Sequence, residues 1–259
     1  MFAVILAGGK GRRFWPASSS KRPKQYLSIT GNRSMLSLTY KRLASFIPTE
    51  KIIVITVKEQ MELARKELPD LPDGNFITEP EGRNTAPALA LGALAVIDKS
   101  DDEPMLACPA DHLISKEDNF RILVEKACGF AEKKNVFITF GILPEYPATG
   151  YGYVEAGNTL GDQQLNVFEV VRFHEKPDRE TAQDYLGNGG FYWNSGIFIW
   201  RPSVFMEGWS KYLPSGSEPL RIIKESAGKP DMQRVIEEQY PRMPSISVDY
   251  GILEKAENV

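Results

Sequence analysis

Residues 2–13, FAVILAGGKGRR, join an apolar run at 2–7 to a glycine-rich, basic turn. A short apolar run that ends in glycines is typical of a buried strand followed by a loop. Similar runs recur at 51–57, 75–78, 104–110 and 135–142, with helix candidates between them at 34–46, 58–67, 85–98 and 117–134. The helices are expected to begin at Ser34, at Asn84 or Thr85, and at Glu117 to Asp118. This alternation predicts βαβ units whose strands, 135–142 included, are buried in a parallel sheet.

The pattern changes after residue 143. Strands are expected near 151–156, 166–174 and 191–200, separated by turns rich in Gly, Pro and Asn and followed by helices. We therefore predict an α/β fold with a Rossmann-like mixed, mostly parallel sheet and helices on both faces. Residues 1–259 are expected to form a single domain, with a first half at 1–142 and a second half at 143–259.

Composition excludes several classes of protein. The 259 residues include 31 Lys and Arg against 34 Asp and Glu, a net charge of −3. This argues against a nucleic-acid partner, because such binders are usually basic. No apolar run is long enough to span a membrane and the N-terminus lacks a charged leader, so we expect no membrane partner and a cytoplasmic location. Cys108 and Cys128 are expected to be buried, reduced thiols.

The first loop concentrates positive charge behind its glycines. Phe14 stands where a dinucleotide fingerprint needs its third glycine, and Gly11 stands where a P-loop needs Ser or Thr. The loop carries no carboxylate from residue 10 to 24, but it does carry Lys10, Arg12, Arg13, Lys21, Arg22 and Lys24. Flexible glycines can turn several N–H groups toward an anion. An anion site is one interpretation; a strand-to-helix turn with a solvated basic face is the other.

Two more loops should meet this one. PADH (109–112) follows the run at 104–110, and EPEGRNTAPA (79–88) follows the run at 75–78. Ligands in open α/β sheets bind at the C-terminal ends of the parallel strands. The sequence therefore predicts a ligand site where the three loops converge.

Seven stretches together resemble one family, and they are spread over nearly the whole chain. They are LAGGKGRRFWPASSSKRPKQ (6–25), EGRNTAPA (81–88), PADH (109–112), PATGYGYVE (147–155), FHEKP (173–177), WNSGIF (193–198) and SVDYGILEKAENV (247–259). They are similar, in order, to the mannose-1-phosphate guanylyltransferases, or GDP-mannose pyrophosphorylases, of the sugar-nucleotidyltransferase superfamily. The resemblance implies a GT-A-like fold and a Mg²⁺-dependent reaction of GTP with mannose 1-phosphate that gives GDP-mannose and pyrophosphate. A homodimer is left open.

The resemblance implies a nucleotide site in the first half. Arg13 and Lys24 match residues that hold the triphosphate, and Gly8, Gly9 and Gly11 match its backbone cradle. Asn84 and Thr85 would lie near base and ribose, although either could simply cap a helix. The implied nucleotide-binding set is Leu6, Ala7, Gly8, Gly9, Gly11, Arg13, Lys24, Glu81, Arg83, Asn84, Thr85, Pro109, Ala110 and Asp111.

Asp111 is the implied metal ligand, since Mg²⁺ prefers oxygen ligands. His112 would face the other side of an extended chain and is expected to be structural. Family members usually continue into a W-x-D-x-G segment whose aspartate is the second metal ligand. The sequence ends at Val259 without that segment, so we expect either the core of a longer protein or a segment supplied from elsewhere. Asp249 matches an acidic S-x-D position but is not assigned to metal.

The resemblance also implies a sugar-phosphate site in the second half. Its members are Gly150, Tyr151, Glu175, Lys176 and Asn194, and Lys176 joins Arg13, Lys24 and Asp111 in the implied catalytic set. Ordinary turns and solvated ion pairs would explain the same residues one by one. Trp193 and His174 are expected to be structural.

Three other functions remain as alternatives. The chain could act on another nucleotide or another hexose 1-phosphate. It could be a non-catalytic sensor or regulatory subunit that binds a nucleotide sugar. A nicotinamide-dependent oxidoreductase would share the βαβ start, but Phe14 argues against it.

Overall fold

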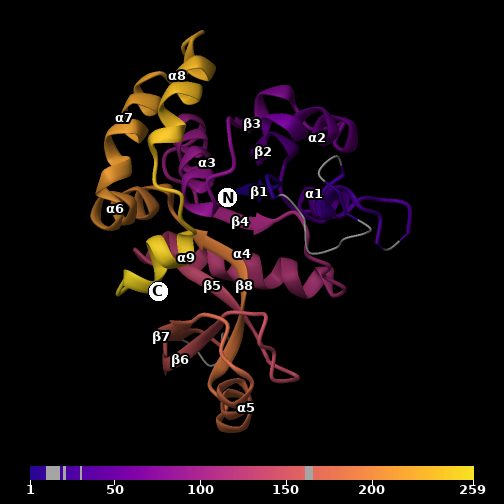
Figure 1. Ribbon diagram of the computed structural model, residues 1–259, viewed down its shortest axis with the longest axis vertical. Helices are drawn as coiled ribbons and strands as arrows, with labels where there is room; N and C mark the ends of the chain where they lie inside the picture. The colour runs from indigo at the N-terminus through magenta and orange to yellow at the C-terminus, as the bar shows by residue number, and fades with distance from the viewer. Residues whose placement is uncertain (10–17, 20–21, 30, 161–165) are drawn as a thin grey trace.

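The computed structural model describes residues 1–9, 18–19, 22–29, 31–160 and 166–259, and the fold is that of these ranges (Figure 1). Their strands form one eight-stranded sheet in the order β3-β2-β1-β4-β8-β6-β7, with β5 paired to β8. The strands are β1 (Phe2–Leu6), β2 (Ile52–Val57), β3 (Phe76–Glu79), β4 (Met105–Pro109), β5 (Ile138–Ile142), β6 (Tyr153–Thr159), β7 (Phe168–His174) and β8 (Phe191–Trp200). The predicted mixed α/β sheet is confirmed.

Strands β1 to β4 form the parallel part of the sheet. β1 pairs with β2 and β4, and β2 pairs with β3, all in parallel register. Side chains alternate along β1: Phe2 and Val4 join one apolar cluster, and Ala3 and Ile5 join another. Both faces are therefore covered, which explains why these strands are continuous apolar runs in the sequence.

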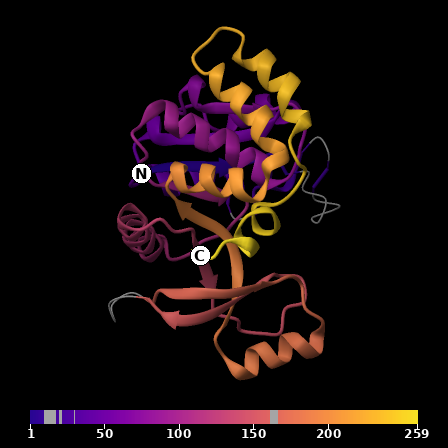
Figure 2. The same cartoon turned by 90° about the vertical axis from the view of Figure 1, so that its left-hand side faces the viewer.

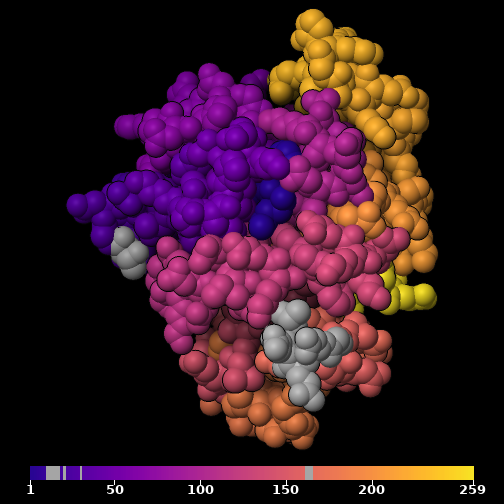
Figure 3. Space-filling model, turned by 180° about the vertical axis from the view of Figure 1, so that it is seen from behind, coloured from indigo at the N-terminus to yellow at the C-terminus, as the bar shows by residue number. Residues whose placement is uncertain are grey.

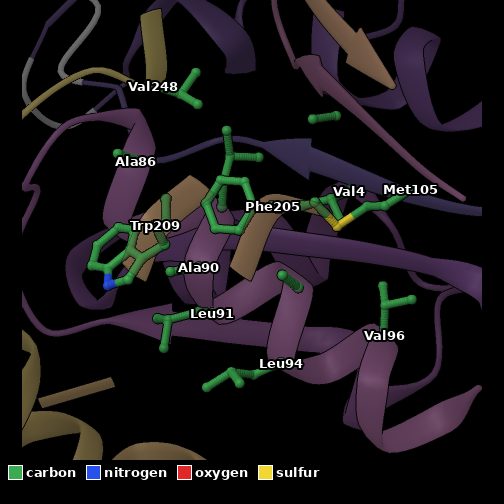
Figure 4. Close-up of a cluster of buried hydrophobic side chains, with 14 of the residues drawn as sticks. Val4, Ala86, Ala90, Leu91, Leu94, Val96, Met105, Phe205, Trp209 and Val248 are labelled. Atoms are coloured by element: carbon green, nitrogen blue, oxygen red, sulfur yellow. The ribbon is translucent and has the colours of Figure 1, made fainter. Parts of the chain in front are cut away.

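Helices cover both faces of the parallel part, as predicted. Residues of α1 (Met35–Ala44), α2 (Met61–Glu67) and α4 (Glu117–Lys133) contribute to one cluster. The other cluster contains residues of α3 (Thr85–Lys99), α6 (Pro202–Tyr212), α7 (Ser217–Glu225), α8 (Met232–Gln239) and α9 (Val248–Gly251). Figure 4 shows part of this second cluster, where Phe205 and Trp209 of α6 lie against alanines and leucines of α3. Both Cys108 and Cys128 are buried free thiols.

The prediction for residues 135–142 needs a correction. β5 pairs antiparallel with β8, not with a parallel neighbour, and its last two residues are exposed. The reason is the path of β8, which runs antiparallel to β4 and hydrogen-bonds it along one edge. β5 takes the other edge of β8, so it keeps the direction of β4 without lying next to it.

The antiparallel strands carry a second lobe. β6 pairs with both β7 and β8, and α5 (Arg179–Asn188) connects β7 to β8. Figure 2 shows α5 below the β6–β7 pair, on the far side of these strands from the parallel sheet. In Figure 3, seen from behind, α4 crosses the molecule between the parallel part and this lobe. Within the described ranges, no helix is long and apolar enough to cross a membrane.

Candidate functional site

The three predicted loops meet at the C-terminal ends of the parallel strands. Ala110 donates its N–H to the carbonyl of Leu6, with 3.1 Å between nitrogen and oxygen, so the ends of β1 and β4 lie together. A Cβ placed on Gly8 would lie 2.5 Å from Oε2 of Glu79 at the end of β3. A side chain at residue 8 would therefore collide with that carboxyl, which is a packing reason for glycine. The predicted convergence is confirmed.

Gly11 and Arg13, two of the residues expected to hold the triphosphate, lie outside the described residues. Gly8 and Gly9 are described, and Gln25 holds the chain on either side of Gly8. Its amide nitrogen Nε2 donates to the carbonyls of Ala7 at 2.7 Å and Gly9 at 2.9 Å. The same nitrogen donates to the side chain of Gln60. Gln25 is 3% exposed, so this anchoring amide is buried beneath the loop.

Lys24 and Asp111 form an ion pair between two of the loops. Lys24 begins the short 3-10 helix Lys24–Tyr26, and Asp111 lies just beyond β4. The lysine nitrogen Nζ is 2.6 Å from Oδ2 of Asp111, and about a quarter of each side chain is exposed, 24% and 25%. Because both side chains are largely buried, the cost of removing the two charges from water offsets much of their attraction, and the pair contributes little to stability, about 0–1 kcal/mol. The pair therefore places opposite charges at the strand ends at little gain in stability, which suits a binding role.

His112 lies beside that pair and not on the opposite side of the chain as expected, because residues 110–111 form a turn and are not extended. Its backbone carbonyl accepts a hydrogen bond from Arg42, and its ring nitrogen Nε2 lies 4.0 Å from Oδ1 of Asp111. Burial lowers the pKa of His112, so its ring is neutral at pH 7. In the described part of the chain, no group of three or more His, Cys, Asp or Glu side chains could hold a metal ion.

The EGRNTAPA motif opens α3. Asn84 has a positive φ of 70°, and its side chain accepts the N–H of Thr85, so Asn84 is the helix N-cap. The hydroxyl oxygen of Thr85 instead accepts a hydrogen bond from the N–H of Val248, at 2.9 Å. Arg83 pairs with Glu81 and donates from Nε to the carbonyl of Met243. The N–H of Ala86 also donates to the carbonyl of Ile246, so the motif is tied at three points to the C-terminal part of the chain.

Glu79 is a buried acid that the sequence analysis did not single out. It ends β3, is 4% exposed and accepts a hydrogen bond from the hydroxyl of Tyr240. Burial raises its pKa to about 7. A glutamate at the end of a strand gives no sequence signal for burial, because its partner lies 161 residues away.

The raised pKa of Glu79 predicts a pH-dependent stability. The folded protein holds this proton more tightly than the unfolded chain, whose glutamate has a pKa near 4.5. Stability is therefore greatest below the unfolded pKa and falls as pH rises toward 7, by about 3 kcal/mol at most. Glu79→Gln keeps an acceptor for Tyr240 and removes this dependence. We expect the variant to gain stability over the wild type between pH 5 and pH 8, as measured by urea denaturation. Parallel stability curves for the two proteins would contradict the assignment.

The second-half residues gather around the β6–β8 pairing. Asn194 lies in β8, and its backbone N–H donates to the carbonyl of Gly152 at 2.8 Å. Glu175 and Lys176 follow β7 and pair with each other. A Cβ on Gly152 would lie 3.4 Å from Oε2 of Glu175 and 3.9 Å from the Cβ of Asn194. The structure therefore brings Glu175, Lys176 and Asn194 together.

Gly150 and Tyr151 precede β6, and Tyr151 belongs to an aromatic cluster. Tyr151 packs its ring edge-on against Trp193, with 5.2 Å between centroids, and Tyr146 does so at 4.9 Å. Trp193 is buried, in line with the structural role expected of it. His174 bonds Glu155 through Nε2 and Tyr185 through Nδ1, which also fits a structural role.

The chain belongs to the nucleotidyl transferase family, whose model matches residues 2–233. Within this class, the curated proteins that it resembles include mannose-1-phosphate guanylyltransferases. It is 41% identical to the mannose-1-phosphate guanylyltransferase of Escherichia coli K12, over 98% of this chain and 54% of that protein. The Klebsiella pneumoniae mannose-1-phosphate guanylyltransferase is 38% identical, over 98% and 54%. The chain thus spans about half the length of the curated relatives it matches.

Solved structures agree on the fold. The crystal structure of a Thermus thermophilus mannose-1-phosphate geranyltransferase superposes with a TM-score of 0.88 at 32% identity, covering 100% of this chain and 72% of that one. A Helicobacter pylori mannose-6-phosphate isomerase superposes with a TM-score of 0.77 at 27% identity, covering 99% and 94%. The family resemblance and the predicted fold class are both confirmed.

Proposed function

We propose that this chain transfers GMP from GTP to mannose 1-phosphate, giving GDP-mannose and pyrophosphate. The observation that carries the proposal is the Lys24–Asp111 pair beside the glycine loop, in a chain 41% identical to a mannose-1-phosphate guanylyltransferase. A phosphate oxygen of the sugar attacks the α-phosphorus of GTP. The bond from that phosphorus to the β-phosphate bridging oxygen breaks, and pyrophosphate leaves with the electron pair. No redox partner and no net proton transfer are needed.

The main obstacle to this reaction is charge repulsion between the two phosphate substrates. Two unit charges about 4 Å apart repel by about 1 kcal/mol in water and by more in a drier site. Catalysis of such transfers is chiefly positioning and charge stabilisation. Lys24 supplies a cation at the strand ends, and the proposal assigns Arg13 to the same triphosphate. The N–H groups of Gly8, Gly9 and Gly11 would face its oxygens.

The proposal includes Mg²⁺, and the residues fit it. Nucleotide-bound Mg²⁺ is held by one or two carboxylates together with substrate phosphates and water. Asp111 offers such a carboxylate, one quarter exposed at the end of β4 and facing a cation that phosphates could also engage. When bound, the ion would neutralise charge on the triphosphate. The protein's own contribution is to hold Asp111 and Lys24 where GTP would enter.

The two substrates are assigned to the two halves of the sheet. Residues 1–142 would bind the nucleotide, with Leu6, Ala7, Pro109 and Ala110 lining it and the 81–85 segment near base and ribose. Residues 143–259 would bind the sugar phosphate. Lys176 would contact its phosphate, Glu175 and Asn194 its hydroxyls, and the backbone at Gly150 and Tyr151 its ring. The guanylyltransferase-like EGRNTAPA motif supports GTP over other nucleotides.

Comparing nucleotides tests this assignment. With mannose 1-phosphate and Mg²⁺ held constant, we expect kcat/KM for GTP to exceed that for UTP, dTTP and ATP by about tenfold or more, since a polar base site rejects mismatched donors and acceptors. Equal rates with all four nucleotides would contradict guanine selection. Saturable binding of GDP-mannose with no turnover of any nucleotide would indicate a sensor instead.

A further inference from the structure

One segment, residues 246–249, touches both halves of the candidate site. On one side, the carbonyl of Ile246 accepts the N–H of Ala86 at 3.1 Å, and the N–H of Val248 donates to Thr85 at 2.9 Å. These bonds fix the segment to the first turn of α3. On the other side, Oδ1 of Asp249 accepts a hydrogen bond from Nδ2 of Asn194 at 2.7 Å. The segment therefore links the start of α3 to β8.

The bond between Asn194 and Asp249 has a defined direction. Oδ1 of Asn194 accepts from the hydroxyl of Thr139 at 3.2 Å and from the N–H of Gly196 at 3.1 Å. The backbone donor identifies that end of the amide as oxygen, so the other end must donate to Asp249. Thr139, Gly196 and Asp249 together hold the amide in one orientation. Among the described contacts, its second N–H has no acceptor.

Asp249 lies close to Asn194 and Lys176 of the second half. Burial raises the pKa of Asp249, while the bond from Asn194 and the charge of Lys176 favour its ionised form. Lys176 also pairs with Glu175, whose carboxylate lies beside Gly152 and Asn194. A carboxylate that accepts a charge-assisted hydrogen bond makes a stronger contact than a neutral group would. Removing the Asp249 carboxylate should therefore leave the amide of Asn194 anchored through Oδ1 alone, with its Nδ2 end loosened.

We propose that Asp249 is a positioning residue for the sugar phosphate: it aims the Asn194 amide at a sugar hydroxyl. Val248, bonded to Thr85, sets the distance between that amide and the nucleotide half. The inference rests on the proposed function and concerns its second substrate. Asp249 acts through Asn194 and needs no contact with the reacting atoms.

The test separates the two substrates. Asp249→Ala should raise KM for mannose 1-phosphate by about tenfold or more, the loss expected when a charge-assisted hydrogen bond is removed. The affinity for GTP, measured separately by calorimetry, should stay within about twofold, because a loosened Asn194 amide does not contact the nucleotide. Asp249→Asn keeps an acceptor for Asn194 and should recover most of the loss. The melting temperatures of all variants are compared alongside.

A double-mutant cycle and a neighbouring acid supply the controls. Asn194→Ala combined with Asp249→Ala should be no worse than Asn194→Ala alone, because both changes remove one interaction. Glu257→Gln changes an exposed acid eight residues further along the chain and should leave KM unchanged.

Multiplicative effects in the cycle, or an equal loss of GTP affinity in Asp249→Ala, would overturn the positioning role. An unchanged sugar-phosphate KM in Asp249→Ala, beside a wild type that turns over, would overturn this inference alone. A wild type without turnover that depends on mannose 1-phosphate would overturn the proposed function as well.

Discussion

Lys24→Ala lowers kcat/KM for pyrophosphate release by about a hundredfold or more, the loss expected when one preorganised charge is removed from a transition state. Lys24 lies 2.6 Å from Asp111 at the ends of the parallel strands, where the proposal places the triphosphate. Because the lysine is partly exposed and its pair contributes little to folding, the melting temperature should change little. Steady-state kinetics and a thermal melt on the same preparation measure both quantities.

A second lysine separates local from general charge effects. Lys224 is exposed on α7, which packs on the opposite face of the sheet from α1 and α2. Lys224→Ala makes the same change in net charge and should leave kcat/KM within about twofold, as surface changes away from the site usually do. Near-normal turnover by Lys24→Ala would exclude Lys24 from triphosphate binding.

Asp111→Asn should abolish the dependence of GTP binding on Mg²⁺. The substitution keeps the size of the side chain and removes the charge that a hard divalent cation requires. In the wild type we expect GTP affinity to rise by about tenfold or more between chelator and millimolar Mg²⁺, because the ion offsets repulsion among the phosphates. In the variant we expect a nearly flat titration. Calorimetry over a range of Mg²⁺ concentrations gives the comparison.

The matched control for this experiment is Asp118→Asn, an exposed carboxylate in the first turn of α4. It lies on the element after Asp111, so it tests whether any nearby negative charge suffices. Its titration should follow the wild type. Superimposable titrations for Asp111→Asn and the wild type would remove Asp111 from the metal site.

Much of the first half could be predicted from the sequence because its strands are buried on both faces. Each of the apolar runs assigned to β1, β2, β3 and β4 agrees with the structure to within one residue at either end. Among the later strands, β8 matches the predicted 191–200, but the more exposed strands are predicted less well: β6 begins at Tyr153, not residue 151, and extends to Thr159, and β7 begins at Phe168, not residue 166. The partner of β5 was not predictable, because an apolar run does not specify which strand lies beside it.

The residues of the candidate site also differ in how far the sequence predicts them. Local motifs place Lys24, Asp111 and Asn84 at the ends of elements, and parallel strands bring such ends together. Glu79 with Tyr240, and Asn194 with Asp249, depend on contacts between segments far apart in the chain. Gln25 lies within a quoted motif, yet only the fold reveals that its amide anchors Ala7 and Gly9. The roles assigned to the site residues, Gly11 and Arg13 included, stay predictions.

The most direct test of the account is pyrophosphate release from GTP and Mg²⁺, with and without mannose 1-phosphate. We predict release that requires mannose 1-phosphate and is much slower with glucose 1-phosphate, since the sugar hydroxyls would be read by fixed groups such as Asn194. In this account, the loops that carry Lys24 and Asp111 bind GTP, and the group around Asn194 binds mannose 1-phosphate. Release at the same rate without any sugar phosphate, or no binding of GTP by the same preparation, would contradict it.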